Sequence, residues 1–415
     1  MKFTCERREI IIFAALLSLS FLVRVLLFSV SGYKNDLTTF TAWFNAAAEH
    51  GPRVFYNVIW SDYPPFNVYL FWAFGSIGRQ IALSGTNLVY LIKLVPNLFD
   101  MATAFLIFVF VRKQFDFKMS LLTVTLYAFN PAVIFNAAVW GQYDAIYTFF
   151  LVLSLMLFFA SKPKLSAVSF ALGVLTKPQS IALAPLILFL IVRKYGWRRL
   201  FTSILAATAT VLVVIIPFEW SNPVSFLVNI YFGALEGYAY TTVNAFNLWA
   251  FGGMWVPETP VLFAAGWLMF GASAAFALFV LHKHLDKSGK LLTLFTAFML
   301  FFAFFMFPTR IHERYLFPAL SMLALMLPFS KKIRPIYAVL TFTCFINQAY
   351  VLQFLNNDQF IQFGDPVVLT VTLINLIVFL YSLMFLPKAL QRKELRQVQT
   401  SQQQKAGSMS KSENK

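Results

Sequence analysis

The chain has 415 residues, of which 59% are hydrophobic and only 12% are charged. The hydrophobic residues come in runs of about twenty, the length that an α-helix needs to cross the hydrocarbon core of a bilayer. This composition excludes a soluble fold and predicts an all-α integral membrane protein.

About twelve membrane crossings are predicted from the apolar runs and the breaks between them. They cover residues 10–30, 90–111, 119–138, 145–160, 165–181, 182–192, 200–217, 261–281, 291–307, 315–329, 336–353 and 366–386. The apolar stretch 64–84 is not counted, because the basic runs alternate correctly with the spans only if it does not cross; its two opening prolines and its aromatic residues suit that position. We expect it to form an interfacial or re-entrant helix inside a long external loop, 31–89.

The basic residues predict the orientation, because cytoplasmic loops carry the excess of Lys and Arg. The basic runs alternate correctly with the spans when all of them lie inside: Lys2/Arg7/Arg8, Arg112/Lys113/Lys118, Lys162/Lys164, Arg193/Lys194/Arg198/Arg199, Lys283/Lys287/Lys290, Lys331/Lys332/Arg334 and Lys388 onward. Both termini are then cytoplasmic. The net charge of +16 matches anionic lipid at this face, so we expect no nucleic acid partner.

The domain organisation is predicted to be simple. Residues 1–390 form one transmembrane domain with external loops at 31–89 and 218–260, and the polar tail 391–415 is expected to be disordered. The first apolar run is interpreted as a retained anchor. Cys5 and Cys344 lie in a tail and a span, so they support neither a disulfide framework nor a metal knuckle.

The first polar motif along the chain is Tyr33-Lys34-Asn35-Asp36, just beyond the first span. A carboxylate here can accept a proton from a hydroxyl nucleophile. The alternative is a helix N-cap made by Asn35 or Asp36, and this segment alone favours the cap.

The second motif is Ser61-Asp62-Tyr63-Pro64-Pro65, in which a rigid turn follows Asp62. The alternative here is a plain Asp turn before proline. A functional role for Asp36 and Asp62 together would also allow them to share Mg²⁺ or Mn²⁺ with substrate phosphates.

Two motifs follow in the middle of the chain. Trp140-Gly141-Gln142-Tyr143-Asp144 occupies a very short external loop, where Trp and Tyr are ordinary belt residues but Gln and Asp are not required. Thr176-Lys177-Pro178-Gln179 places Lys177 on the external side, as a candidate contact for phosphate.

The last strong motif is Pro308-Thr309-Arg310-Ile311-His312-Glu313-Arg314-Tyr315, between two apolar spans. Two guanidiniums beside an imidazole suit a phosphate or diphosphate. The alternative is a cluster in which Glu313 pairs with Arg310 or Arg314. Only His50 and His312 are external among the four histidines, which argues against zinc. The segment 244–249 suits sugar hydroxyls or, equally, a capped turn.

These motifs, in this order over residues 30–350, resemble the GT-C superfamily of multi-span glycosyltransferases. The resemblance is closest to the dolichyl-phosphate-glucose-dependent glucosyltransferases of the asparagine-linked glycan pathway and their prokaryotic relatives. In the first loop, the family's catalytic Asp resembles Asp36 and its Asp-Tyr-Pro-Pro motif resembles Asp62 to Pro65. Its Gln-Tyr pair resembles Gln142 and Tyr143, and its Lys and Gln resemble Lys177 and Gln179. Its Asn-Phe-Trp motif resembles Asn247 to Trp249, and its His-x-His-Glu-Lys motif resembles Arg310 to Arg314. Arg310, Arg314 and the inserted Pro178 depart from that pattern and leave the donor sugar, mannose or glucose, open.

The resemblance implies transfer of a hexose, with inversion, from a polyprenyl- or dolichyl-phosphate sugar to an external glycan, lipid or protein. Asp36 would be the general base, and the donor phosphate would lie against Lys177, Arg310, His312 and Arg314. Acceptor or sugar contacts would come from Asp62, Tyr63, Gln142, Tyr143, Asp144, Gln179, Asn247, Trp249 and Glu313. No cofactor is required, although Mg²⁺ or Mn²⁺ is compatible with the acidic pair. The membrane would be a prokaryotic plasma membrane or the endoplasmic reticulum.

Three other functions were weighed against transfer. A lipid-linked sugar transporter or flippase would place its site at the midplane, between internal repeats, which the sequence lacks. A glycan polymerase or ligase would share the arginines but not the acidic loop. A non-catalytic scaffold would leave the external motifs unexplained.

Overall fold

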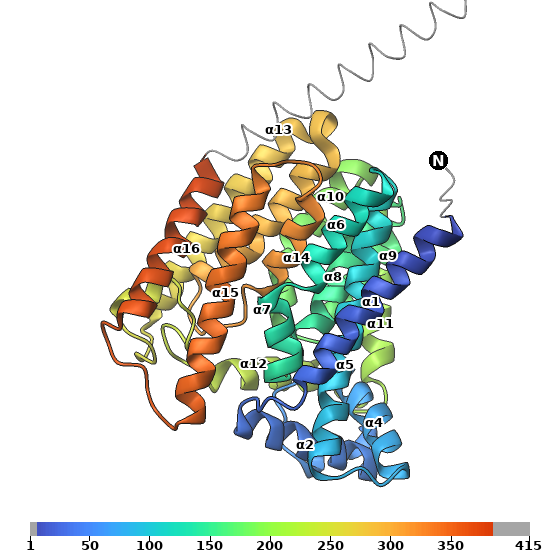
Figure 1. The fold of residues 1–415 in the computed structure, drawn as a ribbon, viewed down its shortest axis with the longest axis vertical. Coiled ribbons are helices and arrows are strands. Elements are labelled where there is room, and N and C mark those ends of the chain that lie inside the picture. The colour runs from blue at the N-terminus through green and yellow to red at the C-terminus, as the bar shows by residue number, and fades with distance from the viewer. Residues whose placement is uncertain (1–5, 385–415) are drawn as a thin grey trace, which may run out of the picture.

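The computed structural model describes residues 6–384 and is built almost entirely from helices (Figure 1). Within this range only isolated β-bridges join extended segments. The elements are α1 (Arg7–Leu27), α2 (Lys34–His50), η1 (Pro52–Val54), α3 (Phe55–Val58), α4 (Pro65–Gln80), α5 (Gly85–Arg112), α6 (Phe117–Ala128), α7 (Pro131–Ile134), η2 (Phe135–Trp140), α8 (Asp144–Phe159), α9 (Pro163–Val174), η3 (Pro178–Leu183), α10 (Ala184–Tyr195), α11 (Trp197–Ile215), α12 (Pro223–Glu236), η4 (Leu248–Gly252), α13 (Pro260–Met306), α14 (Phe317–Met326), α15 (Ile333–Asn356) and α16 (Pro366–Met384).

The chain is a polytopic membrane protein, as its composition predicted. In the described range, eight helices are long and apolar enough to cross a membrane, and the bent pair formed by α6 and 131–140 would make a ninth. The shorter apolar helices α8, α9 and α14 coincide with three further predicted spans. Counting them as crossings gives the predicted number of about twelve.

One predicted boundary was wrong. The spans expected at 165–181 and 182–192 are instead Pro163–Val174 and Pro178–Tyr195. The break falls at Lys177, whose backbone is extended at φ −148° and ψ 135°. A residue before proline is driven out of the helical region by the proline ring, and this explains why the helix stops there. Lys177 therefore lies in a gap between helices.

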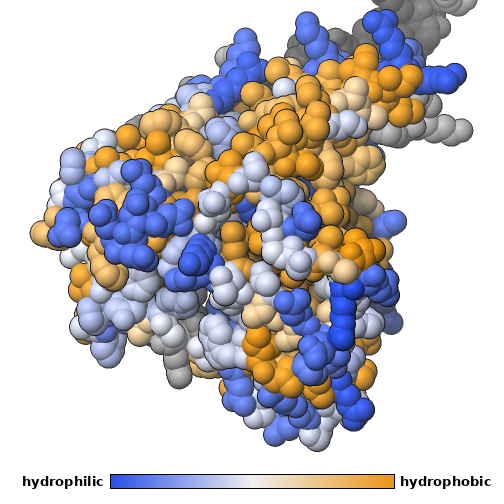
Figure 2. Space-filling model, turned by 60° about the horizontal axis from the view of Figure 1, so that its bottom comes forward, coloured by the Kyte–Doolittle hydropathy of each residue, from blue (hydrophilic) through white to orange (hydrophobic). Residues whose placement is uncertain are grey.

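The first long loop forms a separate layer at one end of the bundle, where α2 and α4 lie together (Figure 1). α4 covers most of the stretch 64–84 and is not among the helices of membrane-spanning length and composition, in agreement with its exclusion from the predicted spans. Gly75 allows it to cross α2 closely, because a Cβ there would lie 2.5 Å from the carbonyl oxygen of Phe44. Hydrophilic residues lie at this end and at the opposite end of the molecule, on either side of a mostly hydrophobic flank (Figure 2).

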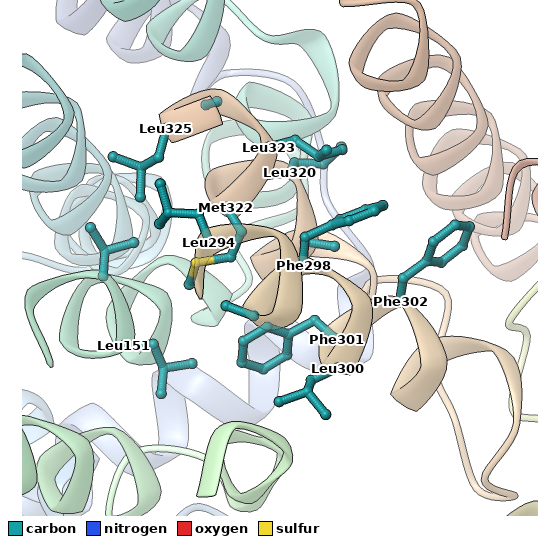
Figure 3. Packing of buried hydrophobic residues seen from close by; sticks show 14 of the residues in the cluster. Leu151, Leu294, Phe298, Leu300, Phe301, Phe302, Leu320, Met322, Leu323 and Leu325 are labelled. Carbon is teal, nitrogen blue, oxygen red and sulfur yellow. The ribbon is translucent and has the colours of Figure 1, made fainter. Parts of the chain in front are cut away.

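The core lies between α8, α13 and α14. α13 contains two membrane-length arms, Pro260–Leu285 and Gly289–Met306, and these lie side by side, with the rings of Trp267 and Phe304 at 6.1 Å. Leu151, Phe298 and Met322 belong to one buried hydrophobic cluster (Figure 3). The second arm and α14 form a largely buried apolar wall that ends at the motif 308–315.

The bent span is held from both sides at its break. Pro131 has no N–H, and the side chain of Asn130 takes the N–H groups of Ala132 and Val133 at 3.0 and 3.2 Å. The carbonyl oxygen of Ala128 therefore loses its helical donor. Ser20 and Arg24 of α1 replace that donor, at 2.8 and 3.0 Å.

Arg24 also belongs to a fully buried cluster inside the membrane domain. It forms an ion pair with Asp100 of α5 at 2.9 Å and donates to Asn97 Oδ1 at 3.2 Å. The hydroxyl of Tyr127 donates to the second oxygen of Asp100 at 2.9 Å. We call Arg24, Asn97, Asp100 and Tyr127 the Arg24 cluster.

Both described ends of the chain, at Glu6 and Met384, lie at the end of the bundle opposite α2 and α4 (Figure 1). The predicted cytoplasmic location of the two termini stays a prediction. Cys5 and the tail 391–415 lie outside the described residues, whereas Cys344 is buried in α15.

Candidate functional site

A cavity of about 570 Å³ lies where the first loop, the break before η3 and the motif 308–315 meet. Its polar wall includes several residues that the sequence singled out: Asp62, Tyr63, Lys177, Gln179, Arg310, His312 and Arg314. Its apolar wall includes Val174, Ile181, Phe232, Phe263, Trp267 and Phe304. The cavity therefore joins charged groups from distant segments to a hydrophobic surface made by α9, η3, α12 and α13.

Lys177 and Arg314 are held from behind by one carboxylate. Asp144 is fully buried and does not line the cavity. Its Oδ1 lies 2.9 Å from Lys177 Nζ, and its Oδ2 accepts from Asn136 at 3.1 Å and lies 3.7 Å from Arg314 Nε. In this structure Asp144 orients two cations; its predicted sugar contact remains a prediction. Asn136 was not singled out from the sequence.

The two arginines of the last motif have different partners. Arg314 pairs with its neighbour Glu313, as in the alternative interpretation of this motif, in which the cluster is held together by such a pair. Arg310 pairs with Glu258 of the preceding loop, its Nε donating to Oε1 at 2.8 Å, and its guanidinium lies 5.3 Å from the ring centre of Phe263. Sequence reasoning missed Glu258, although an acidic residue in an external loop was a usable signal. Both arginines remain at the cavity wall.

His312 is packed between aromatic rings, and its Nδ1 lies 4.0 Å from Glu313 Oε2. The ring centres of Tyr238 and Tyr315 lie 4.9 and 5.2 Å from its own. Burial lowers the pKa of His312 well below its usual value, and the nearby charges of Arg314 and Lys177 lower it further. The imidazole is therefore neutral near pH 7, so it can exchange hydrogen bonds with a phosphate but adds no positive charge.

Asp36 lies in the first turn of α2, where the helix dipole favours an anion. The expected N-cap was wrong: Tyr33 occupies that position and no side chain caps the helix. Instead, Asp36 Oδ2 accepts hydrogen bonds from Trp140 Nε1 at 2.8 Å and Gln142 Nε2 at 2.7 Å. Its Oδ1 accepts no hydrogen bond within residues 6–384. One oxygen is thus fixed while the other is open to a ligand.

Two glycines allow Asp36 to approach Trp140 and Gln142 this closely. A Cβ on Gly32 would lie 2.4 Å from the carbonyl oxygen of Trp140, so any side chain would push the two loops apart. Gly141 has φ +85°, a left-handed conformation that side chains rarely adopt. The contact between Asp36 and its two donors therefore depends on both glycines.

Asp62 lines the cavity, whereas Asp36 is not among its lining residues. Burial raises the pKa of Asp62, while the positive charges of Lys177 and Arg314 lower it. The negative charge of Asp36 also raises the pKa of Asp62. An Asp turn was the alternative for this segment; in the structure, the N–H of Tyr63 bonds to Ser61 Oγ at 3.2 Å.

Four predicted contact residues use their side chains elsewhere. The Tyr143 hydroxyl donates to the carbonyl of Ile92 at 3.2 Å, and Gln142 binds Asp36. Asn247 caps η4 and donates to the carbonyl of Phe305 at 3.0 Å, and Trp249 donates to that of Phe307 at 2.6 Å. The side chains of these four residues are hydrogen-bonded to other protein groups, and their predicted sugar contacts stay predictions.

No group of three or more His, Cys, Asp or Glu side chains that would hold a metal ion occurs between residues 6 and 384. The acidic pair Asp36 and Asp62 is below that number. A role for Mg²⁺ or Mn²⁺ there would need ligands from the substrate phosphates.

A family model described as dolichyl-phosphate-mannose-protein mannosyltransferase matches residues 62–220, more than a third of the chain. The matched region includes Asp62, Asp144 and Lys177 and ends before the motif 308–315. No curated protein matches the chain. The match points to a membrane glycosyltransferase of the GT-C type, the class predicted from the motifs. It does not confirm the closer resemblance to the glucosyltransferases of the asparagine-linked glycan pathway.

Proposed function

We propose that the chain is a hexosyltransferase that moves mannose or glucose from a polyprenyl- or dolichyl-phosphate sugar to an external glycan, lipid or protein, with inversion. The observation that carries this proposal is the cavity that joins a cationic wall to an apolar one. A lipid phosphate sugar has the same division, since its phosphate needs cations and its prenyl chain needs a hydrophobic surface. Its sugar would lie near Asp62.

The donor phosphate would bind between Lys177 and Arg314. Lys177 Nζ has three hydrogens and one ion-pair partner, Asp144, so donors remain for a phosphate oxygen. Because Asp144 orients both cations before the substrate arrives, they need little rearrangement as negative charge grows on the leaving phosphate. Arg310 and neutral His312 would add hydrogen bonds at the edge of the same site.

Asp36 would act as the general base. Its Oδ2 is held by Trp140 and Gln142, which leaves Oδ1 to take the proton of the acceptor hydroxyl. The hydroxyl oxygen then bonds to the anomeric carbon, the bond from that carbon to the phosphate oxygen breaks, and the lipid phosphate leaves with the electron pair. A single in-line displacement of this kind inverts the anomeric centre.

The test is transfer of labelled hexose from polyprenyl-phosphate-mannose and polyprenyl-phosphate-glucose by purified protein in detergent, with a broad acceptor panel. We expect transfer from one of them, and a fall of about a hundredfold or more in Asp36→Asn, because a general base contributes about 10²–10⁴. Asp358→Asn makes the same change at an exposed position and should leave the rate unchanged. A parallel reaction with EDTA tests whether transfer requires a divalent metal ion.

No transfer from either lipid would overturn the proposed function and favour a flippase or a lipid-diphosphate ligase. Full activity in Asp36→Asn would leave the transferase but remove Asp36 as its base.

A further inference from the structure

Asn136 is a fully buried amide that does not line the cavity and that the proposed mechanism does not use. It belongs to η2, a short stretch of π-helix, a form that often occurs at functional sites. Its Nδ2 donates to Asp144 Oδ2 at 3.1 Å and to Gln348 Oε1 at 3.0 Å. Both partners accept hydrogen bonds, so they fix the amide with its nitrogen toward Asp144.

The main chain of Asn136 contacts the other side of the site. Its carbonyl accepts from the N–H of Gln142 at 2.9 Å, and the side chain of Gln142 donates to Asp36. A substitution that changes only the side chain of Asn136 leaves this main-chain bond in place. The direct effect of such a substitution is therefore confined to Asp144 and its partners.

The Asp144 oxygen that Asn136 binds is also the one nearest to Arg314 Nε. The separation between Arg314 Nε and Asp144 Oδ2 is 3.7 Å, beyond hydrogen-bonding distance, and this Nε has no hydrogen-bond partner within residues 6–384. Lys177 bonds to Oδ1 of the same carboxylate at 2.9 Å. With one donor on each oxygen, the carboxylate of Asp144 cannot turn toward Arg314 without stretching one of these two bonds.

We infer that Asn136 is a positioning residue, which holds Asp144 out of a hydrogen bond with Arg314 and so keeps this guanidinium available to the donor phosphate. The identity of the anion rests on the proposed function, whereas the contact between Asn136 and Asp144 exists without a ligand. When the amide of Asn136 is absent, Asp144 turns to Arg314, and the charge-assisted pair that forms competes with the phosphate for the same cation. Gln348 acts one step further back, by orienting the amide.

The first test is an experimental structure of ligand-free Asn136→Leu, a substitution that keeps the approximate volume of the side chain and removes its amide. We expect Arg314 Nε to lie within about 3 Å of Asp144 Oδ2 in this variant, the distance of a hydrogen bond. An unchanged separation of the two atoms would overturn the inference, whatever the substrate of the protein is.

The second test is equilibrium binding of labelled polyprenyl-phosphate-mannose and polyprenyl-phosphate-glucose, measured in Asp36→Asn protein so that no donor is consumed. Adding Asn136→Leu should weaken the better donor about tenfold or more, because Arg314 must leave a charge-assisted hydrogen bond to reach the phosphate.

Asn375→Leu is the matched control for this measurement. Asn375 is also a buried amide, its Nδ2 donates to the carbonyl of Phe246 at 3.0 Å, and its Oδ1, like that of Asn136, has no partner in the described part of the chain. This variant should lose a similar amount of stability, measured by thermal unfolding, and keep the parent affinity for the donor.

A double-mutant cycle with Arg314→Met distinguishes positioning from a general loss of structure. If Asn136 acts through Arg314, adding Asn136→Leu to Arg314→Met should change the affinity by no more than about twofold, because the group that it controls is already absent. The same fold-loss with and without Arg314 would show a structural role alone and would overturn the inference.

The two tests separate the inference from the proposed function. If neither lipid binds to the Asp36→Asn protein, the proposed function fails, and the structure of ligand-free Asn136→Leu still decides whether Asn136 holds Asp144 away from Arg314. If a donor binds and adding Asn136→Leu leaves its affinity unchanged, the function stands and the inference is overturned.

Discussion

Two buried charged clusters in this molecule have similar composition but different surroundings. The Arg24 cluster joins α1, α5 and α6, and both oxygens of Asp100 accept from it, one from Arg24 and one from Tyr127. The cluster around Asp144 also satisfies its carboxylate, but its cations Lys177 and Arg314 face a cavity. One nitrogen of Arg24, Nε, has no hydrogen-bond partner among the described residues, yet Arg24 does not line the cavity of the candidate site.

The difference shows that buried charge alone does not identify a functional site. Ionisable residues within membrane spans are usually a sign of function. Here the Arg24 cluster closes a broken helix, since it supplies a donor to the free carbonyl of Ala128. The Asp144 cluster differs from it, because its cations line a cavity where we propose that the donor phosphate binds. The first cluster should therefore affect stability, and the second should affect transfer.

The largest expected effect comes from Asp100→Asn. It leaves the Arg24 guanidinium buried without a counter-ion, and removing one partner of a buried pair costs about 3–5 kcal/mol. We expect a matching loss in the free energy of unfolding, measured by denaturation in detergent. Lys177→Met should cost less stability, because Asp144 keeps Asn136 and Arg314, but it should abolish most of the transfer. Equal loss of stability in the two variants would contradict the comparison.

A smaller effect is expected where the first loop meets the bent span. Gly32→Ala places a Cβ against the carbonyl of Trp140, and the shift should weaken the hydrogen bonds that hold Asp36. A charge-assisted hydrogen bond contributes about 1.5–3 kcal/mol, so we expect the transfer rate to fall about tenfold or more. Gly271→Ala is the control, because nothing lies within 4 Å of a Cβ there. If both variants keep the parent rate, the fixed position of Asp36 is not needed.

The smallest effect concerns His312. Its pKa is lowered in the folded protein, so the unfolded chain takes up a proton first as the pH falls. Stability should therefore decrease below about pH 6.5, by up to about 1.4 kcal/mol per pH unit. His312→Gln should make this acid-side slope shallower and reduce transfer at pH 7 by no more than about tenfold, because a neutral donor is retained. A loss of a hundredfold would show that the imidazole acts as a cation.

The sequence predicted the helices because they depend on local composition, and it excluded α4 from the spans because the basic runs alternate correctly only if that stretch does not cross. It misplaced the break at Lys177, where the apolar run continues and only the proline announces the end of a helix. Asp62, Lys177 and the motif 308–315 were recognised as polar groups at span ends, and the structure places them around one cavity. Which of them would meet was not predictable from spacing.

The partners of the charged residues were the part that the sequence could not supply. Asp144 and Glu258 bind cations that are 33 and 52 positions away along the chain, and such pairings depend on tertiary packing alone. The Arg24 cluster had a usable signal, since Arg24 and Asp100 both interrupt predicted spans. Asn136 had none, because a single amide on an apolar helix does not reveal what it faces.

The shared carboxylate of Asp144 has a consequence for how the protein is made. Its two cationic partners come from segments that leave the ribosome at very different times, since Arg314 follows Lys177 by more than a hundred residues. A nascent chain that has inserted only as far as α13 holds Asp144 with Lys177 but without Arg314, and its cationic wall is incomplete. The proposed donor site can therefore be completed only after most of the bundle has been synthesised.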